Sequence, residues 1–301
     1  MQQLAAELEQ AQVGDVRVGE PLAKHTTWKI GGPADLFIVP ETQEELATSL
    51  RILNRHGVPW TTLGRGSNTL VSDKGVRGAV IKLGGGFDFV VFDGETVRAG
   101  ASYSFVKLSV VAGKEGLTGL EFAGGIPGSV GGAVYMNAGA HGSDVSCILK
   151  SADIVWEDGT LERCGKEEMG FAYRHSKLQE RRGIVTEASF QLKSGDRKEI
   201  AAALATYKDR RRRTQPLQMA CAGSVFRNPP NDHAARLIEA AGLKGAREGA
   251  AEVSLLHANF IVNHGGAKAE DVLTLIHRVQ STVEDRYGIR LVPEVLLMGE
   301  R

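Results

Sequence analysis

The segment TGLEFAGGIPGSVGGAVYMNAGAHG, residues 118–142, predicts how the chain is organised. Its glycines alternate with short apolar steps, and charged side chains are almost absent. Glycine loses more conformational freedom on folding than any other residue, so such a segment is ordered only where left-handed backbone or close approach to a ligand requires it. An irregular loop packed against a sheet is one interpretation. A buried cofactor lying along the backbone accounts better for a segment that is both glycine-rich and apolar.

Backbone N–H groups in this segment are expected to bind an anion. Successive N–H groups that no side chain covers form anion-binding concavities, and Pro127 stiffens the turn between them. The expected donors are Gly124, Gly125, Gly128, Gly131 and Gly132.

A second glycine-rich turn, Gly64-Arg65-Gly66-Ser67-Asn68, follows a predicted strand. It lacks the GK[ST] ending of a phosphate loop, and Thr69 stands where the dinucleotide fingerprint has its third glycine. It is either a simple tight turn or, together with the first segment, one side of a cradle for a large phosphate-bearing cofactor.

The composition is that of an ordinary globular protein, with 42% hydrophobic and 24% charged residues among 301. Lys plus Arg and Asp plus Glu each number 36, so no net charge favours nucleic acid or an acidic membrane. The polar N-terminus does not resemble a signal peptide, and no apolar run reaches the length of a membrane span. The three cysteines form no CxxC pair, which argues against a zinc site and fits a reducing cytoplasm. We therefore expect a cytoplasmic monomer without a metal and without a nucleic-acid or membrane partner.

The hydrophobic pattern predicts an α+β fold. Up to about residue 195 the chain is rich in strands, with hairpins that turn at Asp93-Gly94 and Asp158-Gly159 and a few helices. Thr42 is expected to cap one of these helices, over residues 43–56. A helix that Pro216 terminates leads into the last part of the chain, where the order strand, helix, strand, helix, strand predicts a small α/β layer. Its final strand is expected over residues 289–299. We place the boundary between two domains, 1–199 and 200–301, in the bridging helix.

Several motifs together resemble the family of UDP-N-acetylenolpyruvoylglucosamine reductases. The resemblance covers nearly the whole chain, and its strength lies in the order of the motifs because no single motif is decisive. In chain order they are TTWKIGGPAD, LGRGSNTLVSD, GLEFAGGIPGSVGGAVYMNAGAHG, YRHSKL, GSVFRNP, HANFIVN and LVPEV.

The resemblance implies a two-part FAD-binding domain of the vanillyl-alcohol-oxidase (PCMH) type over residues 1–199, followed by a small α/β substrate-binding domain over 200–301. It also implies FAD, NADPH as co-substrate, and reduction of UDP-N-acetylglucosamine enolpyruvate to UDP-N-acetylmuramate in peptidoglycan synthesis. Covalent flavin relatives in the wider superfamily use a histidine or cysteine in these loops, and the turn at 64–68 has neither while His141 is the only nearby candidate, so we expect noncovalent FAD. The short spacing between Tyr173 and Ser224 indicates the short type of the family, which lacks an inserted loop with a substrate-clamping tyrosine.

Three catalytic residues are implied by the same resemblance. Arg174 of YRHS matches the arginine beside the developing enolate, Ser224 of GSVFRNP matches the proton donor, and Glu294 of LVPEV matches a residue that orients or polarises the substrate. Without the resemblance, Arg174 could be an ordinary surface arginine, Ser224 a turn serine, and Glu294 a carboxylate at a strand edge.

The resemblance also implies two sets of binding residues. The cofactor set is Gly64, Arg65, Gly66, Ser67, Asn68, Thr69, Leu70, Ala123, Gly124, Gly125, Ile126, Pro127, Gly128, Ser129, Gly132, Asn137, Ala138, Gly139 and Ile184. The substrate set is Tyr173, Arg213, Gln215, Arg227, Asn228 and His257. The basic run at 210–213 is either the solvated end of a helix or a source of one or two arginines for the UDP pyrophosphate.

Two other functions fit parts of the sequence. A different flavin oxidase or dehydrogenase of the same superfamily would oxidise an alcohol or hydroxy acid and would not need NADPH. A catalytically inactive protein that only holds a uridine nucleotide would bind that nucleotide without flavin turnover.

Overall fold

The computed structural model describes residues 1–300, and the chain divides into two compact units. Unit 1 is built from Met1–Gly19, Asp35–Arg65 and Gly78–Asp209, and unit 2 from Glu20–Ala34, Gly66–Arg77 and the chain from Arg210 onward. A single boundary at residue 199 does not describe these units, because two segments from the first third of the chain belong to unit 2. The assignment of cofactor and substrate binding to residues 1–199 and 200–301 stays a prediction.

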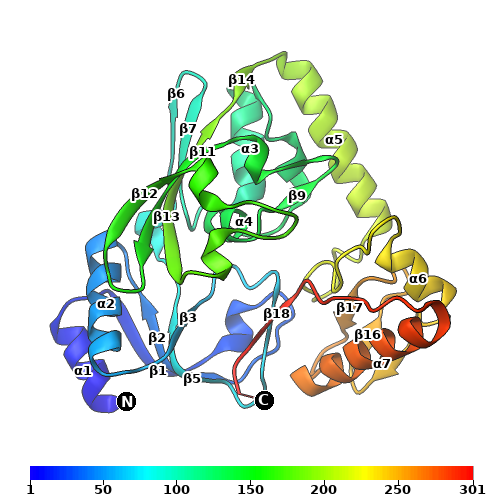
Figure 1. The fold of residues 1–301 in the computed structure, drawn as a ribbon, viewed down its shortest axis with the longest axis horizontal. Helices are drawn as coiled ribbons and strands as arrows, with labels where there is room; N and C mark the ends of the chain where they lie inside the picture. The colour runs from blue at the N-terminus through cyan, green and yellow to red at the C-terminus, as the bar shows by residue number, and fades with distance from the viewer. Residues whose placement is uncertain (301) are drawn as a thin grey trace. The chain divides into compact units, whose positions relative to one another are not determined.

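Unit 1 contains a four-stranded sheet of order β1-β2-β5-β3, and the chain passes between the units within β1, β2 and β5. Helices α1 and α2 pack against this sheet through a core that includes Leu8 and Leu46 (Figure 1). The predicted cap of α2 is confirmed, because Thr42 Oγ1 accepts a hydrogen bond from Glu45 N at 3.2 Å. The elements are α1 (Gln2–Gln10), β1 (Asp15–Pro21), β2 (Pro33–Val39), α2 (Gln43–Arg55), β3 (Trp60–Thr62) and β5 (Val76–Ile81).

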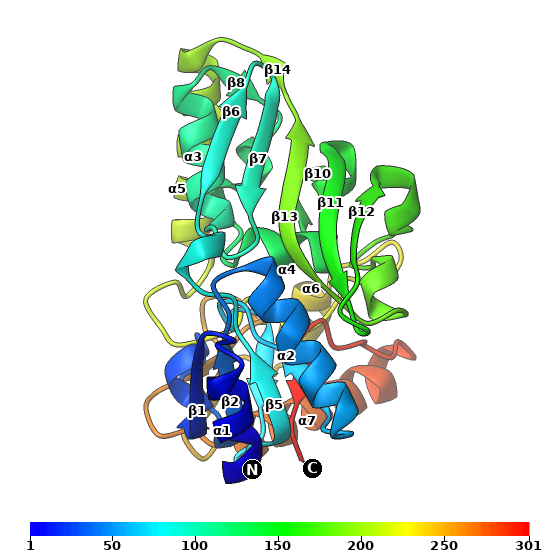
Figure 2. The same cartoon turned by 90° about the vertical axis from the view of Figure 1, so that its left-hand side faces the viewer.

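The second sheet of unit 1 is antiparallel and has the order β12-β11-β13-β7-β6. Figure 2 shows helix α3 beside β6 and β7, and Phe105 and Val134 from α3 and α4 share one core with Val97 and Phe190. Both predicted hairpins are confirmed, since β6 pairs with β7 and β11 with β12. The elements are β6 (Val90–Asp93), β7 (Thr96–Gly100), α3 (Phe105–Lys114), α4 (Val130–Tyr135), β11 (Leu149–Trp156), β12 (Leu161–Gly165) and β13 (Gly183–Gln191).

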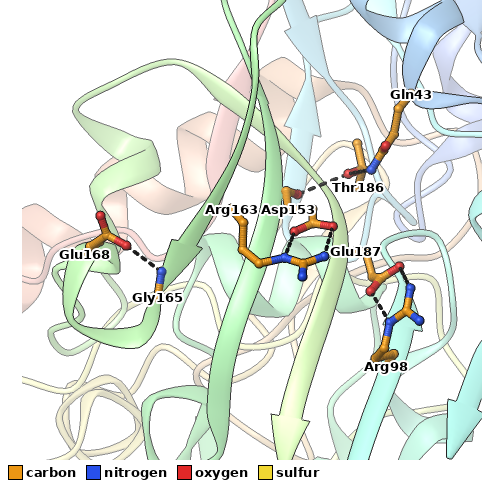
Figure 3. Close-up of polar contacts among 8 residues, drawn as sticks. All are labelled: Gln43, Arg98, Asp153, Arg163, Gly165, Glu168, Thr186 and Glu187. Atoms are coloured by element: carbon orange, nitrogen blue, oxygen red, sulfur yellow. Dashed lines mark hydrogen bonds and ion pairs between the residues drawn. The ribbon is translucent and has the colours of Figure 1, made fainter.

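Charged side chains form pairs across neighbouring strands of the second sheet (Figure 3). Arg163 donates to Asp153 at 2.6 and 2.9 Å, and Arg98 donates to Glu187 at 2.6 and 2.8 Å. Asp153 and Glu187 are register partners on β11 and β13. Like charges directly opposite each other are destabilising, so the two arginines offset this repulsion. The pairs contain none of the predicted site residues.

Short strands and a long helix complete unit 1. The pairs are β8 (Leu117–Thr118) with β14 (Lys193–Ser194), and β9 (Gly139–Ala140) with β10 (Ser143–Asp144). Helix α5 (Arg197–Thr214) then runs from unit 1 into unit 2 and ends before Pro216, as predicted. Among residues 1–300, none of the helices combines the length and the apolar character that crossing a membrane requires.

Unit 2 has a three-stranded antiparallel sheet of order β15-β16-β17 and a parallel pair, β4 with β18. Trp28 and Leu70, which come from its N-terminal segments, share a core with residues of α6 and α7. Trp28 Nε1 donates to Ile261 O of β17 at 2.8 Å. The elements are β4 (Thr69–Val71), α6 (Ala234–Ala240), β15 (Arg247–Glu248), β16 (Ala251–Val253), β17 (Ile261–Asn263), α7 (Ala269–Tyr287) and β18 (Leu296–Met298).

The predicted strand order of the C-terminal part is wrong in detail. The expected strand over 289–299 is reduced to β18, because Pro293 has no N–H for a strand ladder and makes only an isolated bridge to Phe226. Strands β15 and β16 were not predicted, and they precede β17 without an intervening helix. The C-terminal part still contains two helices and several short strands, so it is a mixed α and β structure.

Candidate active site

The glycine-rich segment lies in unit 1 as a 3₁₀ turn (Glu121–Gly125), helix α4 and strand β9. The first three N–H groups of α4 are bonded inside the protein: Val130 to Tyr103 O at 2.9 Å, Gly131 to Ala101 O at 2.9 Å, and Gly132 to Ser129 Oγ at 3.3 Å. The expectation that Gly131 and Gly132 offer these groups to an anion is therefore wrong. Neighbouring backbone and the capping serine already use both donors.

Different physical causes favour glycine at the different glycine positions of this segment. Gly128 has a φ of +141°, where glycine is favoured, whereas Gly124, Gly125 and Gly132 do not have positive φ. A Cβ at Gly124 would lie 2.6 Å from Leu204 Cδ2 of α5, so glycine lets that leucine pack closely without shifting. Gly132 is exposed, and a Cβ there would come no closer than 3.4 Å to Ser129 Oγ. Gly132 therefore offers a surface without a side chain that a ligand can approach, and this fits the predicted cofactor.

Three residues other than glycine have left-handed backbone around this segment. Asn137, His141 and Arg174 have φ values of +42°, +55° and +55°. Such conformations cost free energy and are concentrated at functional sites. The His141 ring stacks on Tyr207 of α5 with centroids 3.8 Å apart.

Arg174 is held against the end of the glycine-rich segment. It lies at the tip of a tight turn in which Ala172 and His175 pair, and its Nη2 donates to Gly139 O at 2.9 Å. Asn137 Nδ2 donates to Ala172 O at 3.0 Å and ties the same turn to the segment. The structure thus brings a predicted catalytic residue together with two predicted cofactor residues inside unit 1. The predicted substrate residue Tyr173 is 53% exposed beside the Arg174 guanidinium.

In the turn at 64–70, contacts with neighbouring protein backbone explain why position 66 is a glycine. Gly66 has a φ of +62°, and a Cβ there would lie 2.3 Å from His25 O and 2.6 Å from Thr26 Cα. The protein chain itself therefore excludes a side chain at Gly66. Gly64 belongs to unit 1, where a Cβ would lie 3.0 Å from Ser129 Oγ of the other glycine-rich segment.

Three predicted cofactor residues lie in hydrophobic cores. Ala123 and Ile184 are buried in two clusters of unit 1, and Leu70 is buried in unit 2. Core packing accounts for these side chains, and their cofactor role stays a prediction. The remaining members of the set lie along the two glycine-rich segments described above.

Within unit 2, Ser224 is brought to Glu294. Glu294 N donates to Val225 O at 2.7 Å, and Arg227 N donates to Val292 O at 2.9 Å, so the two segments run antiparallel. Asn68 Nδ2 donates to Glu294 O at 3.1 Å. Two predicted catalytic residues and one predicted cofactor residue therefore share one small region of unit 2. Ser224 and Glu294 are both half-buried.

The predicted substrate residues of unit 2 differ in their surroundings. Asn228 Oδ1 accepts from Ala234 N at 3.1 Å and so closes the start of α6. Gln215 Oε1 accepts from Arg211 Nε at 2.8 Å, whereas Arg213 is exposed. Arg227 Nε is buried and has no hydrogen-bond partner within residues 1–300. An orphaned buried donor of a cation is costly, and this marks Arg227 as a candidate for an anionic ligand.

His257 has a structural partner. Its Nδ1 accepts a hydrogen bond from Asn259 N at 3.2 Å, and its ring lies edge-on to Phe260. Burial lowers the pKa of His257, which favours the neutral ring that this acceptor role needs. A direct contact with substrate stays a prediction.

Two residues of unit 2 that bear on the candidate site were not among those predicted from the sequence. Arg211 is half-buried, and burial lowers the pKa of its guanidinium. Its neighbours in the basic run, Arg210 and Arg212, are exposed. Helical spacing alone cannot identify the buried member, because the hydrophobic stripe of α5 is weak in its last turn. Asn259 is the second, and its contacts are described below. Within the described chain, no group of three or more His, Cys, Asp and Glu side chains could hold a metal ion.

Comparison with known protein families defines the class of the protein. The model of the FAD binding domain matches residues 34–165, which places the chain among flavoproteins with such a domain. The model of the C-terminal domain of UDP-N-acetylenolpyruvoylglucosamine reductase matches residues 215–298.

Full-length relatives then identify the family. UDP-N-acetylenolpyruvoylglucosamine reductase of Halalkalibacterium halodurans is 54% identical over 301 residues, which is 100% of both chains. The Bacillus subtilis protein of the same name is 51% identical over 300 residues, 99% of each chain. The crystal structure of the reductase from Thermus caldophilus matches with a TM-score of 0.81 at 38% identity and covers 94% of this chain and 98% of that one. The chain belongs to the UDP-N-acetylenolpyruvoylglucosamine reductase family.

Proposed function

We propose that this chain uses FAD and NADPH to reduce the enolpyruvyl group of UDP-N-acetylglucosamine enolpyruvate, giving UDP-N-acetylmuramate for peptidoglycan synthesis. The observation that carries the proposal is the match to reductases of this name along the whole chain at 51–54% identity. When bound, FAD supplies the hydride chemistry that links NADPH to the β carbon of the substrate. Within unit 1, residues around Gly132 and Gly139 would hold it.

Ser224 donates the proton that completes the reaction. Hydride addition to the β carbon pushes negative charge into the substrate carboxylate, and the α carbon must then be protonated. A serine hydroxyl is a weak acid, but its proton goes here to a strong carbanionic base. Support comes from the position of Ser224, one residue from Val225, whose carbonyl accepts from Glu294 N at 2.7 Å.

Arg174 stabilises the negative charge of the enolate, and Glu294 orients or polarises the substrate. Preorganised cations aimed at developing charge are among the largest contributions to catalysis. Support for Arg174 comes from its left-handed backbone and its anchor on Gly139 O at 2.9 Å, which together hold the guanidinium in one place. Holding it beforehand avoids reorganisation during the reaction.

Arg211 and Arg227 contact the pyrophosphate of the nucleotide. Arginine binds phosphate oxygens with two parallel hydrogen bonds, and both of these arginines are partly buried in unit 2. Within residues 1–300 neither guanidinium forms an ion pair with a carboxylate, and partial burial of such a cation favours a ligand that brings its own negative charge. This proposal adds Arg211 to the residues predicted from the basic run.

Separate measurement of the two half-reactions tests the role of Ser224. Ser224→Ala should leave anaerobic flavin reduction by NADPH almost unchanged, since that step needs no proton at the α carbon. Reoxidation by the enolpyruvyl nucleotide should slow by about 10⁴-fold, the upper end of general acid catalysis. Ser224→Cys should retain more activity than alanine, because a thiol still delivers a proton. Equal slowing of both half-reactions by alanine would assign Ser224 to the shape of the site instead.

We also infer that the protein works as a cytoplasmic monomer. All three cysteines are free in the structure, and this suits a reducing compartment. Light scattering on the purified holoprotein measures the oligomeric state, and a dimer mass would refute the monomer. Fractionation of cells followed by immunoblotting tests the compartment.

A further inference from the structure

On one edge, backbone of residues 292–294 pairs with the segment that carries Ser224. In its antiparallel bridge, Phe226 stands opposite Pro293, and the bonds of this edge are made by Val225 O and Arg227 N. In an antiparallel pair, successive residues point their peptide groups to alternate edges. The N–H and C=O of Phe226 therefore point away from residues 292–294, to the other edge.

The side chain of Asn259 pairs with both peptide groups of Phe226 on this other edge. Its Oδ1 accepts from Phe226 N at 2.9 Å, and its Nδ2 donates to Phe226 O at 2.8 Å. The backbone carbonyl of Asn259 also accepts from Val225 N at 2.9 Å. Asn259 is 4% exposed and Phe226 is 2% exposed, so water does not supply these bonds.

We propose that Asn259 is a positioning residue that fixes the place of Ser224 beside Glu294. The inference rests on the proposed role of Ser224 as proton donor. With Asn259 on one edge and residues 292–294 on the other, the peptides that follow Ser224 are held from both sides. A shift of about 1 Å in a reacting group costs about 10²-fold in rate. A segment without regular secondary structure depends on such individual hydrogen bonds to prevent a shift of this kind.

The chemistry of the site requires an amide at position 259. Phe226 presents one donor and one acceptor, and only asparagine or glutamine carries both in one planar group. Aspartate keeps the acceptor for Phe226 N but faces Phe226 O with a second acceptor. Glutamine has the right groups on a longer stem, for which a site 4% exposed leaves little room.

A hydrogen bond to His257 holds the backbone of Asn259 in place. The neutral Nδ1 of His257 accepts from Asn259 N at 3.2 Å, and Ser254 Oγ accepts from His257 N at 3.3 Å. The turn that presents Asn259 is thus fixed before the side chain reaches Phe226. This gives His257 a physical role that needs no contact with the nucleotide.

Asn263 supplies a matched control in the same unit. It is 6% exposed, its Oδ1 accepts from Gly265 N and Ala267 N, and its Nδ2 donates to Trp28 O at 2.9 Å. Asn263→Asp therefore keeps buried acceptor bonds and loses one buried donor bond to a carbonyl, as Asn259→Asp does. Only Asn259 bonds the Ser224 segment through its side chain.

The test measures both half-reactions by stopped-flow absorbance in FAD-loaded Asn259→Asp and Asn263→Asp. Asn259→Asp should reoxidise with the saturating enolpyruvyl nucleotide about 10²-fold more slowly than the unmodified protein, while reduction by saturating NADPH is unchanged. Asn263→Asp should change thermal stability without separating the two rates. If Asn259→Asp does not load FAD, Asn259→Ser is measured in its place, with the same expected direction.

A double variant separates positioning from general damage. If Asn259 acts through Ser224, adding Asn259→Asp to Ser224→Ala should change reoxidation by no more than about twofold, since effects through one group do not add. A further 10²-fold loss in the double variant, or equal slowing of both half-reactions in the single one, overturns the inference. If Ser224→Ala is slow but Asn259→Asp is not, only the inference fails. If Ser224→Ala itself reoxidises normally, the proposed proton donor is wrong, and the inference fails with it.

Discussion

The segment 123–139 of unit 1 and the segment 224–228 of unit 2 are ordered in different ways. In the first, backbone N–H groups of Val130 and Gly131 bond to neighbouring backbone, and glycines allow close packing, as at Gly124 against Leu204. In the second, one backbone bridge and the buried amide of Asn259 hold a short stretch without a helix or strand. The predicted cofactor role of the first segment concerns its side-chain-free backbone, and the predicted substrate role of the second concerns a few side chains.

The difference explains what kind of substitution each segment tolerates. A side chain added to the first segment, or to the glycine turn at 64–68, meets protein or ligand. In the second segment, Val225 and Phe226 belong to the hydrophobic core, whereas the half-buried Ser224 is the proposed proton donor and can be changed without removing core packing. Predictions about FAD binding therefore concern glycines, and predictions about the second half-reaction concern side chains.

The largest expected effect is at Gly66. Gly66→Val combines a left-handed backbone, φ +62°, with a Cβ only 2.3 Å from His25 O, so folded FAD-bound protein should not form. Gly57→Val is the matched control, because Gly57 has a φ of +61° and a Cβ there meets nothing within 4 Å. That variant should fold, with a loss of about 1–3 kcal/mol. Circular dichroism and FAD absorbance on both proteins check this, and a stable yellow Gly66→Val would refute the close approach.

The next effect is expected at Arg174. Arg174→Lys keeps the charge but loses the planar fork that reaches Gly139 O, and it should slow reoxidation by the enolpyruvyl nucleotide by about 10²–10³-fold. Flavin reduction by NADPH should change little. Arg163→Lys, on the sheet face beside Asp153, is the control and should leave both rates unchanged. An unimpaired Arg174→Lys would remove Arg174 from the reaction.

A smaller effect is expected at Gly132, where one substitution should change FAD affinity and the stability of the FAD-free protein in opposite directions. Gly132 lies in helix α4, where alanine is more favourable than glycine by about 0.5–1 kcal/mol. A Cβ there comes no closer than 3.4 Å to Ser129 Oγ, so the protein tolerates it. Gly132→Ala should therefore raise the melting temperature of the FAD-free protein and weaken FAD binding by about tenfold, since about 1.4 kcal/mol of lost contact has that effect. Unweakened binding by fluorescence titration would move the cofactor away from Gly132.

The smallest effect concerns the pH dependence of unit 2. Burial, and then Lys244, lower the pKa of His257, whereas Glu239 acts in the opposite direction. At acidic pH the unfolded chain then binds more protons than the folded one. The contribution of His257 to the free energy of unfolding is therefore fully present above about pH 6.5 and is lost as pH falls below that value. His257→Asn keeps an acceptor for Asn259 N and cannot titrate. Its melting temperature should fall less than that of the unmodified protein between pH 7 and pH 5, and parallel curves would contradict the role of the neutral ring.

The sequence was sufficient to predict elements whose signals are local. The cap at Thr42, the two hairpins and the end of α5 before Pro216 follow from neighbouring residues, and all are confirmed. The glycine-rich segment stood out for the same reason. The physical cause is that capping, turn formation and helix termination each depend on a few adjacent side chains.

Features that depend on distant residues were not predictable. Asn259 bonds a peptide 33 positions away, and the reason for glycine at position 66 is the backbone of His25. Neither relation leaves a periodic pattern in one sequence. The N-terminal segment with Trp28 joins unit 2 through Ile261, a contact that spans 233 residues. Only the folded chain shows such pairs.

The central claim, that this chain passes reducing equivalents from NADPH to the enolpyruvyl nucleotide through FAD, is tested most directly on the unmodified protein. NADPH is added to the yellow holoprotein without oxygen, the excess is removed, and UDP-N-acetylglucosamine enolpyruvate is then supplied while absorbance near the flavin maximum is followed. The account predicts bleaching by NADPH and full recovery of colour with the nucleotide, together with one equivalent of UDP-N-acetylmuramate. Bleaching by an alcohol or hydroxy acid instead, or a bleached protein that the nucleotide does not reoxidise, would contradict it.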